Sequence, residues 1–169
     1  MILGRHMCKE YAFVEKLAGD SKLVLRFLAV FSRFEYALKR AGYLKKSENA
    51  EPNWDTFANK LKGDFKRVQE TSFKEAVKYL LQNPPKTQIV SGKQLDWTNN
   101  KQGDGESKER YILRLIQTIR NNLFHGGKYP TGPMYDTARD QNLLTNALIV
   151  LKQCLELGND VREFFAETP

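Results

Sequence analysis

Apolar residues recur at steps of three and four positions along most of the chain, which is the period of an amphipathic α-helix. In the stretch 22–41 they form an aromatic-rich stripe, so a long helix is expected there, ending at Gly42. The same period predicts further helices over 9–17, 53–62, 72–81, 107–125 and 136–157, followed by a last short turn over 161–165. The apolar faces of such helices are buried when the helices pack against one another around a shared core.

The segments between the stripes are polar or carry residues that break helices. Asn83-Pro84-Pro85 is expected to end the helix over 72–81, because proline lacks the N–H that a helix interior needs. Polar stretches over 43–53 and 99–106 are expected to be loops, the second of them mobile.

One segment does not follow the helical period. The β-branched pair within 88–93 predicts a single short strand or an extended loop, which Leu95 and Trp97 would dock to the core. Since no internal repeat or heptad series is present, the expected fold is all-α, an irregular bundle of about four to six helices.

Length and composition fit one ordinary globular domain. The chain has 169 residues, of which 41% are hydrophobic, and a mean hydropathy of −0.56. No apolar run approaches the ~18 residues that a membrane span needs, so no membrane insertion is expected. A single domain over 8–169 is the simplest reading.

Residues 1–7 are left out of this domain. They lack the basic start, apolar segment and cleavage site of a secretory signal, and His6-Met7 is what a common cloning site encodes at a start codon. They are interpreted as an expression-vector remnant, with the natural chain expected to begin at Met7. His125 would then be the only native histidine.

Cysteine spacing and net charge limit the kinds of site and partner that are expected. Cys8 and Cys154 form no C-x-x-C pair and have no histidine at metal-ligand spacing, so neither a zinc site nor a disulfide scaffold is expected, and a reducing cytoplasm fits best. The net charge of +7 and the pI of 9.4 favour an anionic partner, of which nucleic acid is the commonest. The alternative is an ordinary soluble surface that happens to be basic.

The stretch 120–127 combines a guanidinium, an amide and an imidazole at the end of a predicted helix. Asn121 and His125 are an i, i+4 pair on one helix face, and Arg120 lies on the adjoining face. A guanidinium fits phosphate oxygens and an imidazole titrates near neutrality, so these are the parts of a phosphodiesterase that needs no metal or other cofactor. The alternative is that His125 is merely favoured by the helix dipole while Arg120 and Lys128 are solvated.

The run Arg120-Asn121-Asn122-Leu123-Phe124-His125 resembles the R-x4-6-H signature of HEPN domains, and the segment 31–38 resembles their first helix. The resemblance covers about 22–157, with strong identity only at the motif. It implies a helical bundle that dimerises, so that two motifs face each other and form a composite RNA-cleaving cleft.

The resemblance also implies roles for single residues. Arg120 and His125 would be catalytic and Asn121 would support them, with the ribose 2′-hydroxyl attacking the adjacent phosphate. Members of the family usually act as toxins or effectors in defence against phages and plasmids, or in RNA processing. The tyrosine that a nucleotidyltransferase antitoxin modifies in one subgroup is replaced here by Gly127, and Tyr129 comes two residues later. An antitoxin of that kind is therefore not expected, and an unrelated inhibitor or a defence-system protein is left open as a partner.

Further residues are candidates for the same site. Glu35, Asn122 and Tyr129 are candidate supporting groups, although Glu35 can instead form an i, i+4 ion pair with Lys39. The candidate RNA-backbone contacts are Lys128, Arg33, Lys45 and Lys46, with Lys93 and Arg139 as further basic positions.

Three functional hypotheses follow. The first is a metal-independent endoribonuclease acting as a homodimer. The second is a non-catalytic module that binds RNA or nucleotide at the same cationic helix end. The third is a helical subunit whose wide final helix docks a larger partner in a toxin–antitoxin or defence complex.

A single native histidine would have to serve as both base and acid, which independently favours a second copy of the motif across a dimer.

Overall fold

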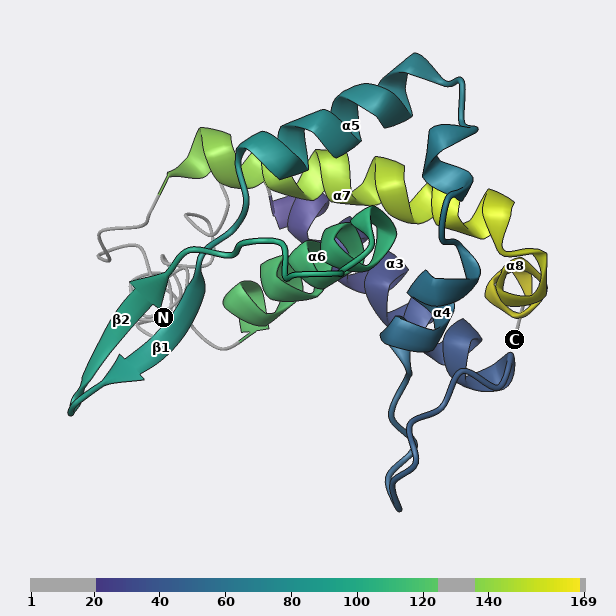
Figure 1. The fold of residues 1–169 in the computed structure, drawn as a ribbon, viewed down its shortest axis with the longest axis horizontal. Helices are drawn as coiled ribbons and strands as arrows, with labels where there is room; N and C mark the ends of the chain where they lie inside the picture. Colours follow the sequence, from purple (N-terminus) through teal and green to yellow (C-terminus); the bar gives the residue numbers. More distant parts are fainter. Residues whose placement is uncertain (1–20, 125–135, 168–169) are drawn as a thin grey trace, which may run out of the picture.

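Six α-helices and one β-hairpin make up the part of the chain that the computed structural model describes, residues 21–124 and 136–167 (Figure 1). The predicted all-α bundle is confirmed. The elements in chain order are α3 (Ser21–Arg40), α4 (Trp54–Lys60), the 3-10 turn η1 (Asp64–Lys66), α5 (Thr71–Gln82), β1 (Thr87–Ser91), β2 (Gln94–Thr98), α6 (Lys108–Phe124), α7 (Thr137–Leu157) and α8 (Asn159–Ala166). The helix expected over 9–17 lies outside the described residues.

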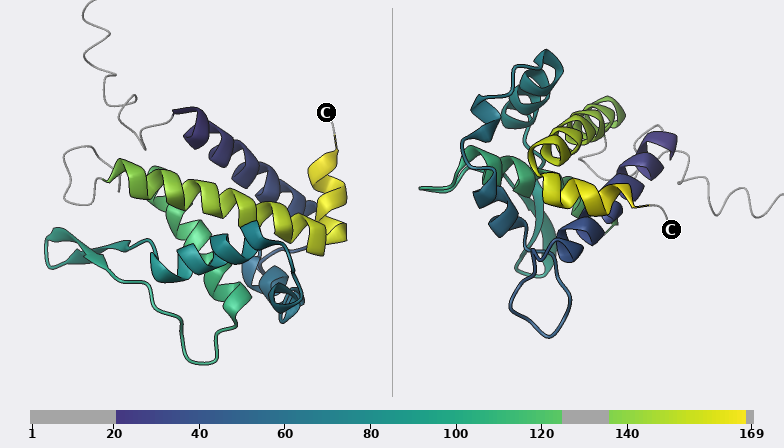
Figure 2. Two further views of the ribbon diagram at one scale, coloured as in Figure 1. Left: turned by 90° about the horizontal axis from the view of Figure 1, so that it is seen from above. Right: turned by 90° about the vertical axis from the view of Figure 1, so that its right-hand side faces the viewer.

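Helix α7 runs through the middle of the bundle. It lies between α3 on one side and α5 and α6 on the other, and α8 turns across the end of α3 (Figure 2). Its wide apolar face, which buries residues from Leu143 to Leu155, is therefore covered by several neighbours at once. No helix in the described part of the chain is both long and apolar enough to span a bilayer.

Side-chain caps set the starts of three helices where the sequence predicts them. Asn53 Oδ1 accepts from the Thr56 N–H at 3.0 Å before α4, Ser107 Oγ accepts from the Arg110 N–H at 3.2 Å, and Asp136 Oδ1 accepts from the Arg139 N–H at 3.0 Å. Each bond satisfies an N–H that has no partner within the helix. Gly42, at φ 86°, follows α3 in the left-handed conformation that glycine accepts without strain.

The segment after α5 is a hairpin of two strands, so the single strand expected over 88–93 was only half of the element. Strand β1 pairs antiparallel with β2 in a register that sets Val90 opposite Leu95 and Gln88 opposite Trp97. The hairpin projects from the helical body (Figure 1), and Leu95 is 70% exposed. The prediction that Leu95 docks this segment to the core is therefore wrong, because Leu95 belongs to the projecting second strand.

An aromatic cluster joins α3 to α4 near the C-terminal end of α6. The Trp54 ring stacks on Phe34 at 5.2 Å between centroids and on Phe31 at 5.3 Å. Phe57 meets Phe34 edge-on at 5.6 Å. Because all four rings are buried, α4 is held against the same stretch of α3 that faces α6.

Gly158, between α7 and α8, sits where a side chain has no room. A Cβ at this position would lie 2.9 Å from Phe57 Cε2 and 3.1 Å from the Cys154 carbonyl oxygen. Gly158→Ala is therefore expected to cost about 1–3 kcal/mol of unfolding free energy by overpacking. Urea denaturation beside Gly103→Ala, whose Cβ would meet nothing closer than 3.8 Å, checks this; equal midpoints for the two variants would contradict it.

Candidate functional site

The described end of α6 presents three side chains of the motif together. Arg120 Nη1 donates to Asn121 Oδ1 at 3.1 Å, and the Arg120 guanidinium carbon lies 4.6 Å from the centre of the Phe124 ring. The same guanidinium carbon lies 5.9 Å from the centre of the buried Phe31 ring of α3. The guanidinium is thus held by ring faces and one amide oxygen.

Arg120 differs from the other arginines of α6 in its partners. Arg110 forms a bidentate pair with Asp55 at 2.8 and 2.9 Å, and Arg114 forms one with Glu106. Within residues 21–124 and 136–167, no carboxylate forms an ion pair with Arg120. Its donors are therefore not neutralised by a described acidic side chain and can meet an anion.

Phe124 was not among the candidates from the sequence, although a signal was present. It is 57% exposed, one of the most exposed large apolar side chains described. The apolar stripe of α6 runs through Ile112, Ile119 and Leu123, and Phe124 lies one position off that stripe. A phenylalanine on the solvated side of an amphipathic helix is what base stacking requires.

Asn122 serves the scaffold in this structure. It is buried at 7% exposure, and its Nδ2 donates to the Lys86 carbonyl oxygen at 2.9 Å. This bond ties the residues just before β1 to the last described turn of α6. Asn122 therefore stabilises the position of the motif and does not share the exposed face of Asn121.

Three of the proposed site residues, His125, Lys128 and Tyr129, lie outside the described residues, as do Gly126 and Gly127. Since His125 directly follows Phe124 in the chain, the described part of the site ends one residue before it. Their roles stay predictions.

Glu35 and Lys45 come together in a cleft of about 440 Å³ beside α6. In place of the expected ion pair with Lys39, Glu35 Oε1 accepts from Trp54 Nε1 at 3.4 Å. Lys45 pairs with Glu51 at 2.9 Å, which holds the pKa of the lysine above its ordinary value. Lys46 is exposed next to Lys45.

Two further basic candidates have backbone partners elsewhere in the fold. Arg33 Nε donates to the Phe165 carbonyl oxygen at 3.0 Å, and its Nη2 donates to the Glu167 carbonyl oxygen. Arg139 Nη2 donates to the Pro84 carbonyl oxygen at 2.9 Å. These contacts fasten α8 to α3 and α7 to the end of α5, so the structure does not bring either guanidinium to Arg120.

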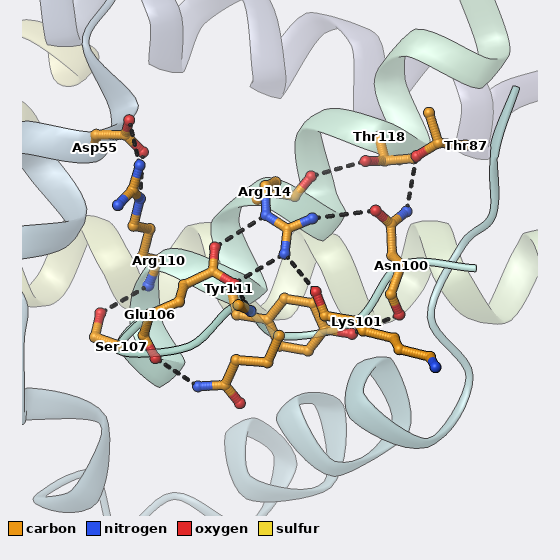
Figure 3. A network of polar contacts seen from close by, with 12 residues as sticks. Asp55, Thr87, Asn100, Lys101, Glu106, Ser107, Arg110, Tyr111, Arg114 and Thr118 are labelled. Carbon is orange, nitrogen blue, oxygen red and sulfur yellow. Dashed lines mark hydrogen bonds and ion pairs between the residues drawn. The ribbon is translucent and has the colours of Figure 1, made fainter. Parts of the chain in front are cut away.

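A polar network around Arg114 holds the loop over 99–106 and the base of the hairpin against α6 (Figure 3). Arg114 binds both oxygens of Glu106 at 2.9 Å, the Asn100 side chain at 3.1 Å and the Lys101 carbonyl oxygen at 2.9 Å. Asn100 in turn donates to Pro85 O at 2.6 Å and to Thr87 Oγ1 at 2.9 Å. The loop that the sequence predicts to be mobile is therefore fastened by Arg114 of α6 and by its own Asn100.

The network makes a pH-dependent contribution to stability. Hydrogen bonds from Arg114 hold the pKa of the Glu106 carboxyl below its ordinary value of 4.5, against the opposing effect of burial. A lowered folded pKa stabilises the fold above the unfolded pKa, and this stabilisation is lost as pH falls through the folded value. Glu106→Gln is expected to lose about 1–2 kcal/mol at neutral pH, since Arg114 is partly open to solvent. The difference from wild type should shrink as pH falls below about 4.5.

Urea denaturation from neutral to acidic pH checks this, with Glu156→Gln as the matched control. Glu156 pairs with Arg162 at 2.8 Å in a site where both side chains are about half exposed, so its loss should cost little. A deficit of Glu106→Gln that stayed constant down to acid pH would contradict the account.

Cys154 offers no nucleophile to this site. It is fully buried among core residues, and burial raises the pKa of its thiol well above the ordinary value. The thiol therefore stays protonated and inert. In the described part of the chain, no three His, Cys, Asp or Glu side chains gather closely enough to hold a metal ion.

No family model, curated protein or solved structure matches the chain.

Proposed function

We propose that the protein is a metal-independent endoribonuclease of the HEPN type, acting as a homodimer in which two copies of the motif form one RNA-cleaving cleft. The observation that carries the proposal is the arrangement at the end of α6: an arginine with no described carboxylate partner, bonded to Asn121 and stacked on the exposed Phe124, one residue before His125. The net charge of +7 would draw RNA to it.

The expected reaction is a transesterification within the RNA strand. The ribose 2′-oxygen attacks the adjacent phosphorus as a base removes its proton, and the P–O5′ bond breaks as an acid protonates the leaving oxygen. The products are a 2′,3′-cyclic phosphate and a 5′-hydroxyl. Arg120 would stabilise the charge on the non-bridging oxygens, and Asn121 would orient the guanidinium.

A dimer would supply a second imidazole for the acid–base steps. In a single chain His125, the one histidine of the motif, would have to act as base at one oxygen and as acid at another. Two copies of the motif across a two-fold axis give two imidazoles and two guanidinium groups to one phosphate. In the cell the protein would act in the cytoplasm as a toxin or a defence effector, held in check by an inhibitor or a defence-system partner.

Phe124 gives the proposal a binding test. A nucleobase next to the scissile phosphate can stack on one face of the Phe124 ring, because Arg120 lies over the other face. Phe124→Ala is expected to weaken single-stranded RNA binding by about 1–3 kcal/mol, measured by fluorescence anisotropy in a His125→Ala background. Phe124→Trp should retain the affinity, and an unchanged affinity in Phe124→Ala would contradict stacking at this site.

The chemistry is tested by the products. Wild-type protein incubated with RNA in excess chelator is expected to release fragments that end in 2′,3′-cyclic phosphate, detected by mass spectrometry. The same oligonucleotide with 2′-deoxyribose throughout should stay intact, since the attacking oxygen is missing. Fragments that carry 5′-phosphates, or cleavage of the deoxy strand, would refute attack by the 2′-oxygen.

The same helix end also supports a binding module without cleavage, because an exposed ring beside a guanidinium holds a nucleotide whether or not a bond breaks. RNA binding that depends on Arg120 and Phe124, with no cyclic phosphate from any RNA supplied, would select this function.

A further inference from the structure

A cleft lies beside α6 on the N-terminal side of the motif. The 440 Å³ cleft opens between α3, the loop before α4, and α6, and Gln117 of α6 lines it. Asn121 follows Gln117 by four residues, so it lies about 6 Å further along the helix axis on the same face. The cleft and Arg120 are thus neighbours on one helix, and a strand whose phosphate meets Arg120 can place an adjacent base in the cleft.

The charges of the cleft are balanced. Its lining includes three carboxylates, from Glu35, Glu51 and Asp55, and three cations, from Lys45, Arg110 and Arg114. The cations are engaged: Lys45 with Glu51 at 2.9 Å, Arg110 with Asp55 at 2.8 Å, and Arg114 with Glu106 at 2.9 Å. A phosphate would meet three carboxylates and a metal ion would meet three cations. The lining therefore favours an uncharged ligand that both donates and accepts hydrogen bonds.

Among the described residues, Glu35 is the one carboxylate of the cleft that forms no ion pair, since Glu51 is paired with Lys45 and Asp55 with Arg110. Its described bond, from Trp54 Nε1, is 3.4 Å long, beyond the usual range for N–H donors. An ionised carboxylate offers about four lone-pair positions on two adjacent oxygens, so it can accept from two neighbouring donors at once. Gln117 uses one N–H of its amide on the Leu113 carbonyl oxygen at 3.2 Å, which leaves a second N–H for a ligand.

Among nucleobases, this donor and acceptor set matches guanine. The Watson–Crick edge of guanine carries two adjacent donors, N1–H and N2–H, beside the acceptor O6. Adenine and cytosine set one amino group beside an acceptor ring nitrogen, and uracil sets one N–H between two carbonyl oxygens. A carboxylate would face a repelling lone pair in each of those cases.

We propose that the cleft is a guanine-binding subsite, in which Glu35 accepts from N1–H and N2–H and Gln117 donates to O6. It would select the base beside the phosphate held by Arg120. The inference rests on the proposed function in one respect: an RNA strand must join the cleft to Arg120. Binding of guanine to the cleft can be measured without any cleavage.

Nucleotide binding is measured by the fluorescence of Trp54, which lines the cleft. Trp97 is the other tryptophan of the chain, so Trp97→Phe leaves Trp54 as the single indole. We expect GMP to bind this protein at least tenfold more tightly than IMP, which lacks the N2 amino group, or AMP, both of which carry the same phosphate. Glu35→Gln, of equal shape, should weaken GMP binding at least tenfold and leave AMP unchanged.

The control is Glu75→Gln, an exposed carboxylate on α5 that should change neither affinity. Circular dichroism of Glu35→Gln separates loss of the ligand from loss of the fold. Equal affinities for GMP and AMP, or GMP affinity untouched by Glu35→Gln in a folded protein, would overturn the subsite.

Cleavage of RNAs with a single guanine separates this inference from the nuclease proposal. Selective GMP binding without any RNA cleavage would leave the subsite standing and remove the nuclease. Cleavage without preference for guanine, together with equal affinities for the mononucleotides, would leave the nuclease standing and remove the subsite. If both stand, Glu35→Gln should raise KM at the guanine site more than it lowers kcat.

Discussion

Arg120→Ala is expected to lower kcat for RNA cleavage about 10²- to 10³-fold, the usual effect of removing one group that stabilises the charge developing on an oxyanion. The guanidinium is already held by Phe31, Phe124 and Asn121. It therefore loses little conformational entropy when RNA binds. These contacts are cation–π contacts and one hydrogen bond to an amide, so the substitution should cost less than about 1 kcal/mol of unfolding free energy.

Two further variants make the result specific to the guanidinium. Arg120→Lys keeps the charge but not the planar fork, and should recover only part of kcat. Arg67→Ala removes an equal charge from an 83% exposed side chain and should leave kcat unchanged. Single-turnover cleavage separates the chemical step from binding. Equal loss in the Arg67 and Arg120 variants would assign the effect to net charge and contradict a role at the phosphate.

Phe34→Ala is expected to be the most destabilising of the single substitutions considered, at about 3–5 kcal/mol of unfolding free energy. Phe34 is fully buried, and its ring contacts Trp54, Phe57 and Phe165, which belong to α4 and α8. The truncation therefore leaves a cavity where three elements meet. Because Trp54 also lines the cleft beside Glu35, a folded fraction of this variant should bind GMP weakly.

Urea denaturation at fixed protein concentration measures the effect. Leu25→Ala, on the same helix but 69% exposed, is the matched control and should change stability by less than about 0.5 kcal/mol. A loss below about 1 kcal/mol in Phe34→Ala would mean that the aromatic cluster is not what joins these helices.

The helices were predictable because their signals are local. The period of three and four in 22–41, the cap at Asn53 and the break at Asn83-Pro84-Pro85 each act within a few residues, and α3, α4 and α5 follow them closely. The second strand was missed because its apolar residues, Leu95 and Trp97, resemble a docking segment when read alone. Only the pairing across Gly92-Lys93 makes them a strand.

The contacts that place the candidate site join residues far apart in the chain. Arg114 with Asn100, Asn122 with Lys86, and Glu35 with Trp54 connect positions whose separation carries no sequence period. The sequence therefore indicated Arg120 and Asn121 but not the cleft one turn away. Arg33 shows the reverse: a basic residue that looks available for RNA in the sequence is bonded to the carbonyl groups at the end of α8.

Comparing RNA cleavage by wild type and by His125→Ala, on mixed RNA in excess chelator, tests most directly whether the protein is a ribonuclease. Wild type is expected to cleave the RNA, and His125→Ala to do so at least about 10²-fold more slowly, because the proton transfers lose the imidazole of the motif. Cleavage at the same rate by both proteins, or by neither while RNA binding persists, would contradict the assignment as a ribonuclease.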